Sequence, residues 1–482
     1  MLYRGIGRGK RGPEQRRRRR IPVSRVCDAA FAVHRSRHRL PGIRQGIAPR
    51  VTLVATLLVA AGLVGGGLAA ASRSAAGASP GPGAVARTAV PSTSTVPSIT
   101  GPSLVVPTGV LRPVPDVPGA LPAEDVIVGD NVYQLVTSAV TGRTVVRRFD
   151  LTAGTSSVVA VIPRGHEAID LAATSTGLAW LETWSAEAAV HGAPATGPPA
   201  SVGQGAGPSG LGWQIVTLRV ADGTARVVAS GVNTRIAIGG AGASVNPPLL
   251  AAGGTRIVYT LDAAAGAAPV STRIVIRDAG TATIVRQIDV ASYVSQIGLS
   301  GQAMFYVGVR AGPTPVATDP NDGTLVLVPS VSATPRVVDT HVKDATIGGD
   351  LLAWAREDAV DGSVEVASLA GGAPARVPGP RVPMVPGGHV LSFGLAATAG
   401  WIGWIVAAPQ ADGSFATDLV LWQPGLPAAE AVEGLRQPDF VAFGDGWAIW
   451  REGNPSSGTT DTHVVRLTDL PTGLRQLPSG QL

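Results

Sequence analysis

The chain has 482 residues, only 15% of them charged, with 62 glycines and 39 prolines. This composition lacks the runs of Glu, Lys and Leu that are typical of helical proteins, so it favours a β-rich globular part. The net charge of +6 is uneven, because residues 1–50 hold 15 Arg or Lys against Glu14 and Asp28. This segment carries +13 and the remainder −7, which argues against nucleic acid as a partner of the main domain.

Residues 1–50 are expected to form a basic cytoplasmic tail. The five arginines at 16–20 suit contact with lipid headgroups and the setting of membrane topology better than nucleic-acid binding. The single cysteine, Cys27, lies in this tail, so the rest of the chain can contain no disulfide and no thiolate metal site.

Residues 51–72, VTLVATLLVAAGLVGGGLAAAS, carry no charge and lie between Arg50 and Arg73. At about 1.5 Å per residue, a helix of this length crosses the roughly 30 Å of a bilayer core. The excess of arginine before residue 51 predicts an N-terminus inside, and a single-pass protein of the cell membrane with an extracytoplasmic main domain. Residues 69–71 are all alanine and resemble a signal-peptide cleavage site, so a cleaved segment is the alternative.

Residues 73–122 are predicted to be a linker. The stretch is composed mainly of Ala, Gly, Ser, Thr and Val and has ten prolines up to Pro122. Such a composition cannot bury a core and favours extended polyproline geometry. We therefore place the globular domain at 123–482.

A unit recurs through this domain, and in each copy one strand has a bulky apolar residue at its centre, which we call the repeat residue. The copies include STGLAWLE at Trp180, GGDLLAWARE at Trp354 and GDGWAIWRE at Trp450. The full set of repeat residues is Leu135, Trp180, Tyr259, Tyr306, Trp354, Trp404 and Trp450. Apart from one interval of 79 residues, which contains an insertion, they are 45–50 residues apart.

Each unit consists of four short apolar strands separated by turns that contain Gly or Asp, without helical periodicity. About seven such units predict an all-β fold, a β-propeller of seven four-stranded blades, preceded by one transmembrane helix and a disordered linker. Face-to-face packing of blades needs bulky side chains at equivalent heights, so the tryptophans of these strands are expected in the core. The segment SLVVPTGVLRPV at 103–114 is expected to add a strand to the last blade.

The Gly-bounded strand with an aromatic residue, followed by a strand rich in Val and Ile, resembles the repeats of periplasmic TolB-type propellers and more loosely WD repeats. The resemblance concerns the strand pattern, because the Ser-Pro-Asp-Gly turn and the closing Trp-Asp are missing. It implies a fold and carries no functional residue to this chain.

An insertion at about 184–212 interrupts the second unit and is too rich in Pro and Gly to fold alone. Long loops on rigid scaffolds often bind partners. We interpret Trp184, His191 and Trp213 as a partner-binding loop, and the alternative is a loop left by drift.

The sequence offers no catalytic or metal-binding signature in this domain. The histidines are scattered singly, there is no Gly-x-Ser-x-Gly elbow, and we expect no metal and no cofactor. Acidic residues after the repeat residues could pair as acid and base, but their recurrence is what repetition itself produces: Glu182, Asp262, Glu357 and Glu452.

The sequence therefore favours a membrane-anchored extracytoplasmic propeller, a non-catalytic module that binds a protein or cell-envelope ligand. Two alternatives stay open. One is a cell-surface or periplasmic hydrolase with carboxylates at the propeller channel, and the other is a transmembrane sensor that signals through the basic tail.

Overall fold

The computed structural model describes residues 103–104, 106, 111–115, 120–138, 140–185, 211–233, 247–263, 271–309, 323–380, 388–426, 428–432, 434–454 and 459–470. The basic tail at 1–50, the apolar segment at 51–72 and most of the linker at 73–122 lie outside these residues. Within the described residues, no helix has the length and apolar character needed to cross a bilayer. The prediction of a transmembrane helix at 51–72 is thus untested.

The described residues form 28 strands, β1–β28, and one short 3₁₀ helix, η2 (Leu467–Asp469). Hydrogen bonds join the strands into six sheets. Five of these sheets are single blades, and the sixth has seven strands. The all-β propeller predicted from the sequence, and its resemblance to propeller repeats, are confirmed at the level of the fold.

The first three blades follow the chain and are antiparallel throughout. The first contains β3 (Ala120–Val128), β4 (Asn131–Ser138), β5 (Thr144–Asp150) and β6 (Thr155–Val161). The second contains β7 (Glu167–Thr174), β8 (Gly177–Ser185), β9 (Leu211–Arg219) and β10 (Thr224–Asn233). The third contains β11 (Leu250–Gly253), β12 (Arg256–Ala263), β13 (Ser271–Asp278) and β14 (Ile284–Val290).

The seven-stranded sheet departs from the prediction of separate four-stranded blades. It contains β15 (Tyr293–Ser300), β16 (Ala303–Val309), β17 (Gly323–Val328), β18 (Arg336–Gly348), β19 (Leu351–Arg356), β20 (Val364–Ser368) and β21 (Ala375–Val377). The long strand β18 pairs with β17 through its first half and with β19 through its second, and Val342 is in register with both neighbours. Two expected units therefore share one continuous strand. His341, which directly precedes Val342 in β18, has a positive φ of 58°.

The last two blades each take a strand from the N-terminal side. One contains β22 (Leu391–Thr398), β23 (Trp401–Pro409), β24 (Phe415–Trp422) and β25 (Glu430–Val432), and β1 (Ser103–Leu104) pairs in parallel with β25. The other contains β26 (Pro438–Gly444), β27 (Trp447–Asn454) and β28 (Thr459–Arg466), and β2 (Arg112–Val114) completes it antiparallel to β28. The expectation that 103–114 adds a strand to the last blade is confirmed.

The predicted boundary between linker and propeller is correspondingly too late. Residue 122 lies inside β3, and the propeller already includes β1 and β2. The prolines of this stretch led to the prediction of a linker. Pro113 is nevertheless compatible with a strand, because β2 is the outermost strand of its sheet and proline, which has no N–H, is tolerated on edge strands.

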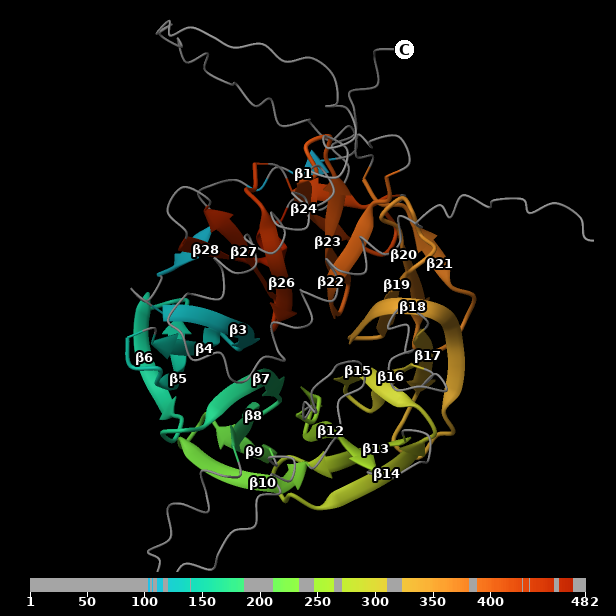
Figure 1. The fold of residues 1–482 in the computed structure, drawn as a ribbon. Coiled ribbons are helices and arrows are strands. Elements are labelled where there is room, and N and C mark those ends of the chain that lie inside the picture. Colours follow the sequence, from blue (N-terminus) through green and yellow to red (C-terminus); the bar gives the residue numbers. More distant parts are fainter. Residues whose placement is uncertain are drawn as a thin grey trace, which may run out of the picture. The chain divides into compact units, whose positions relative to one another are not determined.

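The innermost strands contact one another around a centre in the order β3, β7, β11, β15, β18, β22 and β26, and β26 returns to β3 (Figure 1). The turns between first and second strands also approach their neighbours. Gly349 has φ +58°, and a Cβ there would lie 2.6 Å from Cα of Ala399 in the next turn, so only glycine fits.

Apolar side chains fill the space between successive sheets rather than within one sheet. Trp180 packs with Leu135 and Tyr133 of the preceding blade, and Trp450 packs with Trp401. All seven repeat residues are at most 8% exposed, which confirms their predicted place in the core. Burial of large side chains of this kind typically contributes about 2–3 kcal/mol each.

Candidate functional site

Four antiparallel strands return the chain to the end where it started, so successive units begin at the same end of the propeller. At this end the first strands begin and the second strands end, and we call it the insertion face. The predicted insertion leaves this face after Ser185 in β8 and returns at Leu211 in β9. Residues 186–210 of the insertion lie outside the described residues.

Glu182 in β8 is the centre of a hydrogen-bonded cluster at the insertion face. Its side chain is only 4% exposed, and Oε1 accepts a hydrogen bond from Nε1 of Trp180 at 2.9 Å. Oε2 accepts from Nε2 of Gln214 at 2.7 Å and lies 2.9 Å from Nδ1 of His166. Both oxygens of the buried carboxylate thus have partners, which compensates for the loss of water.

The strand geometry explains why these residues meet. Trp180 and Glu182 are two residues apart in β8, so their side chains project from the same side of the sheet. Gln214 is directly opposite Glu182 in the β8–β9 register. His166 ends a turn before β7 in which its amide donates to the carbonyl of Pro163 at 3.1 Å.

Trp184 extends this cluster to the edge of the insertion. Its ring stacks on that of His166, with centroids 4.5 Å apart and an interplanar angle of 14°. The ring also covers Gly212, where a Cβ would lie only 2.3 Å from it. His166 and Trp184 are both half-buried, so they form a rigid aromatic surface that is still partly open to solvent.

The three residues of the predicted partner-binding loop have different environments. Trp184 lies in the cluster just described, and His191 lies outside the described residues. Trp213 is 4% exposed and packs at 5.9 Å from Tyr259 of the next blade. Its side chain therefore fills the core between two blades.

A second carboxylate–histidine pair lies in the last blade. Glu452 follows Trp450 by two residues, as Glu182 follows Trp180. Oε1 of Glu452 lies 2.9 Å from Nε2 of His463, and Oε2 accepts from the amide of Arg436 at 2.8 Å. Burial acts to raise the pKa of Glu452, but the hydrogen bonds of His463 and Arg436 outweigh it, and the pKa is lowered.

The sequence did not identify His166 or His463 as partners of these carboxylates. A usable signal was the Trp-x-Glu pattern at 180–182 and again at 450–452. Of the other two acidic residues singled out, Asp262 lies near the end of β12 and Glu357 follows β19, where its amide donates to the carbonyl of His341. Glu182 and Glu452 pair with histidines and not with a second carboxylate.

The arrangement could orient a histidine for hydrogen bonding or proton transfer. A carboxylate on one ring nitrogen fixes the tautomer and leaves the other nitrogen for a ligand. Among the described residues there is no group of three or more His, Cys, Asp or Glu side chains that could hold a metal ion.

A further charged cluster closes the ring between the last blade and the first. Asp125 is 2% exposed, accepts from Nε2 of Gln134 at 2.9 Å and lies 3.9 Å from Nε of Arg451. Burial raises the pKa of Asp125 against the opposing effect of Arg451. Its near-complete burial makes it part of the junction rather than of an open site.

No protein-family model and no curated protein sequence matches the chain. Solved structures are similar in fold. The β-propeller domain of the Trilobed protease from Pyrococcus furiosus is 8% identical with a TM-score of 0.47, over 75% of this chain and 98% of that one. Pyrococcus horikoshii acylaminoacyl peptidase is 9% identical with a TM-score of 0.45, over 73% and 53%.

A post-proline cleaving enzyme from Rickettsia typhi is 7% identical with a TM-score of 0.46, over 72% of this chain and 52% of that one. The chain thus spans about half the length of these two peptidases. Similarities of this size concern the fold alone.

Proposed function

We propose that the chain is a membrane-anchored, extracytoplasmic and non-catalytic binding module, whose propeller contacts a protein or cell-envelope ligand at the insertion face. The observation that carries this proposal is the stacked pair of His166 and Trp184 at the edge of the insertion. Rigid aromatic side chains lose little conformational entropy on binding and are enriched in protein interfaces.

The carboxylate beneath this pair supports the same role. Both oxygens of Glu182 are occupied by hydrogen bonds from the protein itself. Such a carboxylate holds His166 in place, because its oxygens are engaged by side chains of the protein itself. Preorganised surfaces of this kind bind with a smaller entropic cost.

Trp184→Ala in the full chain tests the proposal, with His463→Ala as the matched control in the second carboxylate–histidine pair. Both variants would be expressed in the native membrane, crosslinked and identified by mass spectrometry. We expect a specific partner to be lost with Trp184→Ala and retained with His463→Ala. Equal recovery from both variants would contradict a site at the His166–Trp184 pair.

A hydrolase is the second candidate, and the His166–Glu182 pair is the observation that favours it. A histidine oriented by a buried carboxylate is the arrangement used by general bases. An activity on peptide or glycan substrates that falls at least about 100-fold in His166→Ala, while the protein remains folded, would replace the binding proposal.

Membrane anchoring is part of the proposal and rests on residues 51–72. Protease added to intact cells should degrade the propeller and leave the tail at 1–50 protected. A mature N-terminus just after the alanines at 69–71 would instead establish cleavage. A cellular response that changes on deletion of 1–50, without a change in localisation, would favour the sensor alternative.

We also propose that the ring has seven blades, with the seven-stranded sheet counted as two that share β18. The support is the cycle of seven innermost strands and the seven apolar clusters among the described residues, each between two successive units. A crystal structure with another number of innermost strands would refute this count.

A further inference from the structure

A groove of about 590 Å³ lies between the β11–β14 blade and the following sheet. It is lined by Arg256, Val285, Arg286, Gln302, Ser330, Val331 and Ser332. The lining comes from the starts of β12 and β14, from the turn before β16 and from the turn after β17. These elements lie at the end of the propeller opposite the insertion face, so this groove is separate from the site described above.

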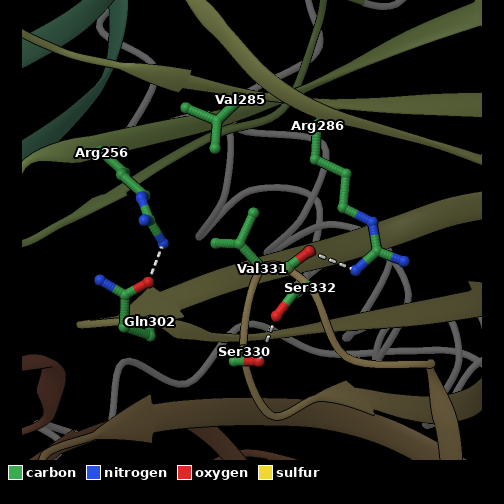
Figure 2. Close-up of a pocket in the computed structure, with 7 residues that line it drawn as sticks. All are labelled: Arg256, Val285, Arg286, Gln302, Ser330, Val331 and Ser332. Atoms are coloured by element: carbon green, nitrogen blue, oxygen red, sulfur yellow. Dashed lines mark hydrogen bonds between the residues drawn. The ribbon is translucent and has the colours of Figure 1, made fainter.

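Two arginines face the groove from the same blade. Figure 2 shows Arg256 and Arg286 on opposite sides of it, with Arg256 directed toward Gln302 and Arg286 toward Val331. Nη1 of Arg256 donates to Oε1 of Gln302, and Nη1 of Arg286 donates to the carbonyl of Val331 and, at 2.7 Å, to that of Ala333.

These contacts orient the guanidinium groups without using all of their donors. A guanidinium has five N–H donors, and the hydrogen bonds that the two arginines make to the described residues use only Nη1. Within the described part of the chain, Nε and Nη2 of each are left for a ligand. A pre-oriented fork of this kind matches the two oxygens of a carboxylate or phosphate.

The charge in the groove is not cancelled by its lining, which contains two arginines and no acidic residue. The nearest carboxylate in register with Arg256 is Asp278. That carboxylate accepts hydrogen bonds from the amides of Thr281 and Gly280, which are the main reason that its pKa is lowered. Asp278 is therefore engaged in its own turn and only partly offsets the two positive charges.

The remaining lining suits a ligand with a small apolar part. The hydroxyls of Ser330 and Ser332 lie 3.4 Å apart on the floor of the groove. Val285, which is 42% exposed, and Val331 provide apolar surface between the arginines. The volume is within the range of about 300–1,000 Å³ found for small-molecule sites.

We infer that this groove binds a small oxyanion ligand, one that presents a phosphate or carboxylate group to Arg256 and Arg286 and its apolar part to Val285. The serine hydroxyls complete the oxyanion contacts. Because the groove is at the opposite end of the propeller, this inference can fail without affecting the proposed function.

Isothermal titration of the full chain in detergent, with inorganic phosphate and with N-acetylglycine, tests the inference. We expect saturable binding of at least one probe. Arg256→Ala should weaken it at least tenfold, because a charge-assisted hydrogen bond corresponds to about that factor or more. Preferential binding of phosphate or of N-acetylglycine would identify which oxyanion the groove takes.

Two further variants separate binding from folding. Arg286→Lys keeps the charge but loses the planar fork, so it should also weaken binding while the melting temperature stays near that of the wild type. Arg273→Ala is the control, since Arg273 is exposed, pairs with Asp289 in the same blade and does not line the groove. Binding of neither probe, or binding unchanged in Arg256→Ala, would overturn the inference.

Discussion

The β7–β10 blade and the β26–β28 blade carry the same three-residue pattern and use it differently. In the first, Glu182 accepts hydrogen bonds from the Trp180 indole and the Gln214 amide, and pairs with His166. In the second, Glu452 has one side-chain partner and one backbone donor, and the indole N–H of Trp450 has no partner in the described structure.

The two blades also differ in how they are completed. The β7–β10 blade is built from one continuous part of the chain and contains the insertion. In the last blade, β2 from the N-terminal side of the propeller pairs with β28. A repeated sequence pattern therefore determines the strand and its core residue. The hydrogen bonds made by the glutamate two positions later depend on which partners the neighbouring segments place beside it.

The largest expected loss of stability comes from a substitution in β2, the N-terminal strand of the last blade. Val114 in β2 is 3% exposed and packs in the core between the last blade and the first. Val114→Asp buries a charge and detaches the strand, so we expect the free energy of unfolding to fall by about 4 kcal/mol. Val158→Asp is the control, because Val158 lies on the outermost strand β6 and is 58% exposed. Comparable melting temperatures for both variants would show that β2 does not hold the ring.

A smaller loss in the free energy of unfolding is expected when the carboxylate of Glu182 is removed. Glu182→Ala leaves the buried donors of Trp180 and Gln214 without an acceptor, which should cost about 3 kcal/mol. Glu452→Ala should cost about 2 kcal/mol, because fewer side-chain donors depend on it. Thermal unfolding of the two variants side by side measures the difference. The opposite order would mean that the last blade, and not the β7–β10 blade, has the stronger network.

The second carboxylate also predicts a pH dependence. The pKa of Glu452 is lowered in the folded state, so its contribution is complete above the unfolded value of 4.5 and is lost as the pH falls through the folded pKa. Glu452→Gln should therefore reduce stability by about 1 kcal/mol at pH 7 and by much less at pH 3. Chemical denaturation at the two pH values checks this, and an equal loss at both would contradict it.

The carboxylate of Asp418 should have the opposite effect on the pH dependence of stability. Burial raises the pKa of Asp418 in β24 to about 6, and no hydrogen bond to it is found within the described residues. A raised pKa means that ionisation opposes folding, so stability increases as the pH falls through about 6. Asp418→Asn should stabilise the protein by about 1 kcal/mol at pH 7.5, after allowance for solvent screening, and have no effect near pH 3. Destabilisation at pH 7.5 would indicate an ionic partner.

Much of the fold could be predicted from the sequence, because each repeat residue sits between turns and at near-regular spacing. Burial of Trp180, Trp354 and Trp450 follows from this pattern. The sharing of β18 could not be predicted, since apolar spacing does not encode whether a hydrogen-bond ladder is interrupted between units.

The site was predicted less completely for a similar reason. Trp184 was identified from its place beside the insertion, but His166 joins Glu182 through strand pairing across 16 residues, which composition cannot show. Trp213 lies beside the same insertion, yet the β9–β10 pairing places its ring over Gly231, where a Cβ would lie 2.7 Å from it. Proximity in sequence to a loop thus does not decide whether a side chain faces solvent.

The pairing of the N-terminal strand β2 with the last blade also constrains the order of folding. During synthesis β2 leaves the ribosome early, but its partner β28 follows more than 300 residues later, as do Asp445, which accepts a hydrogen bond from the amide of Gly129, and Trp447, whose indole donates to Asp130. Contacts of such sequence separation form late and slow the search for the native state. The ring must therefore remain open, with β2 unpaired, until the C-terminal strands have been made, and this interval is when the chain is most exposed to misassembly.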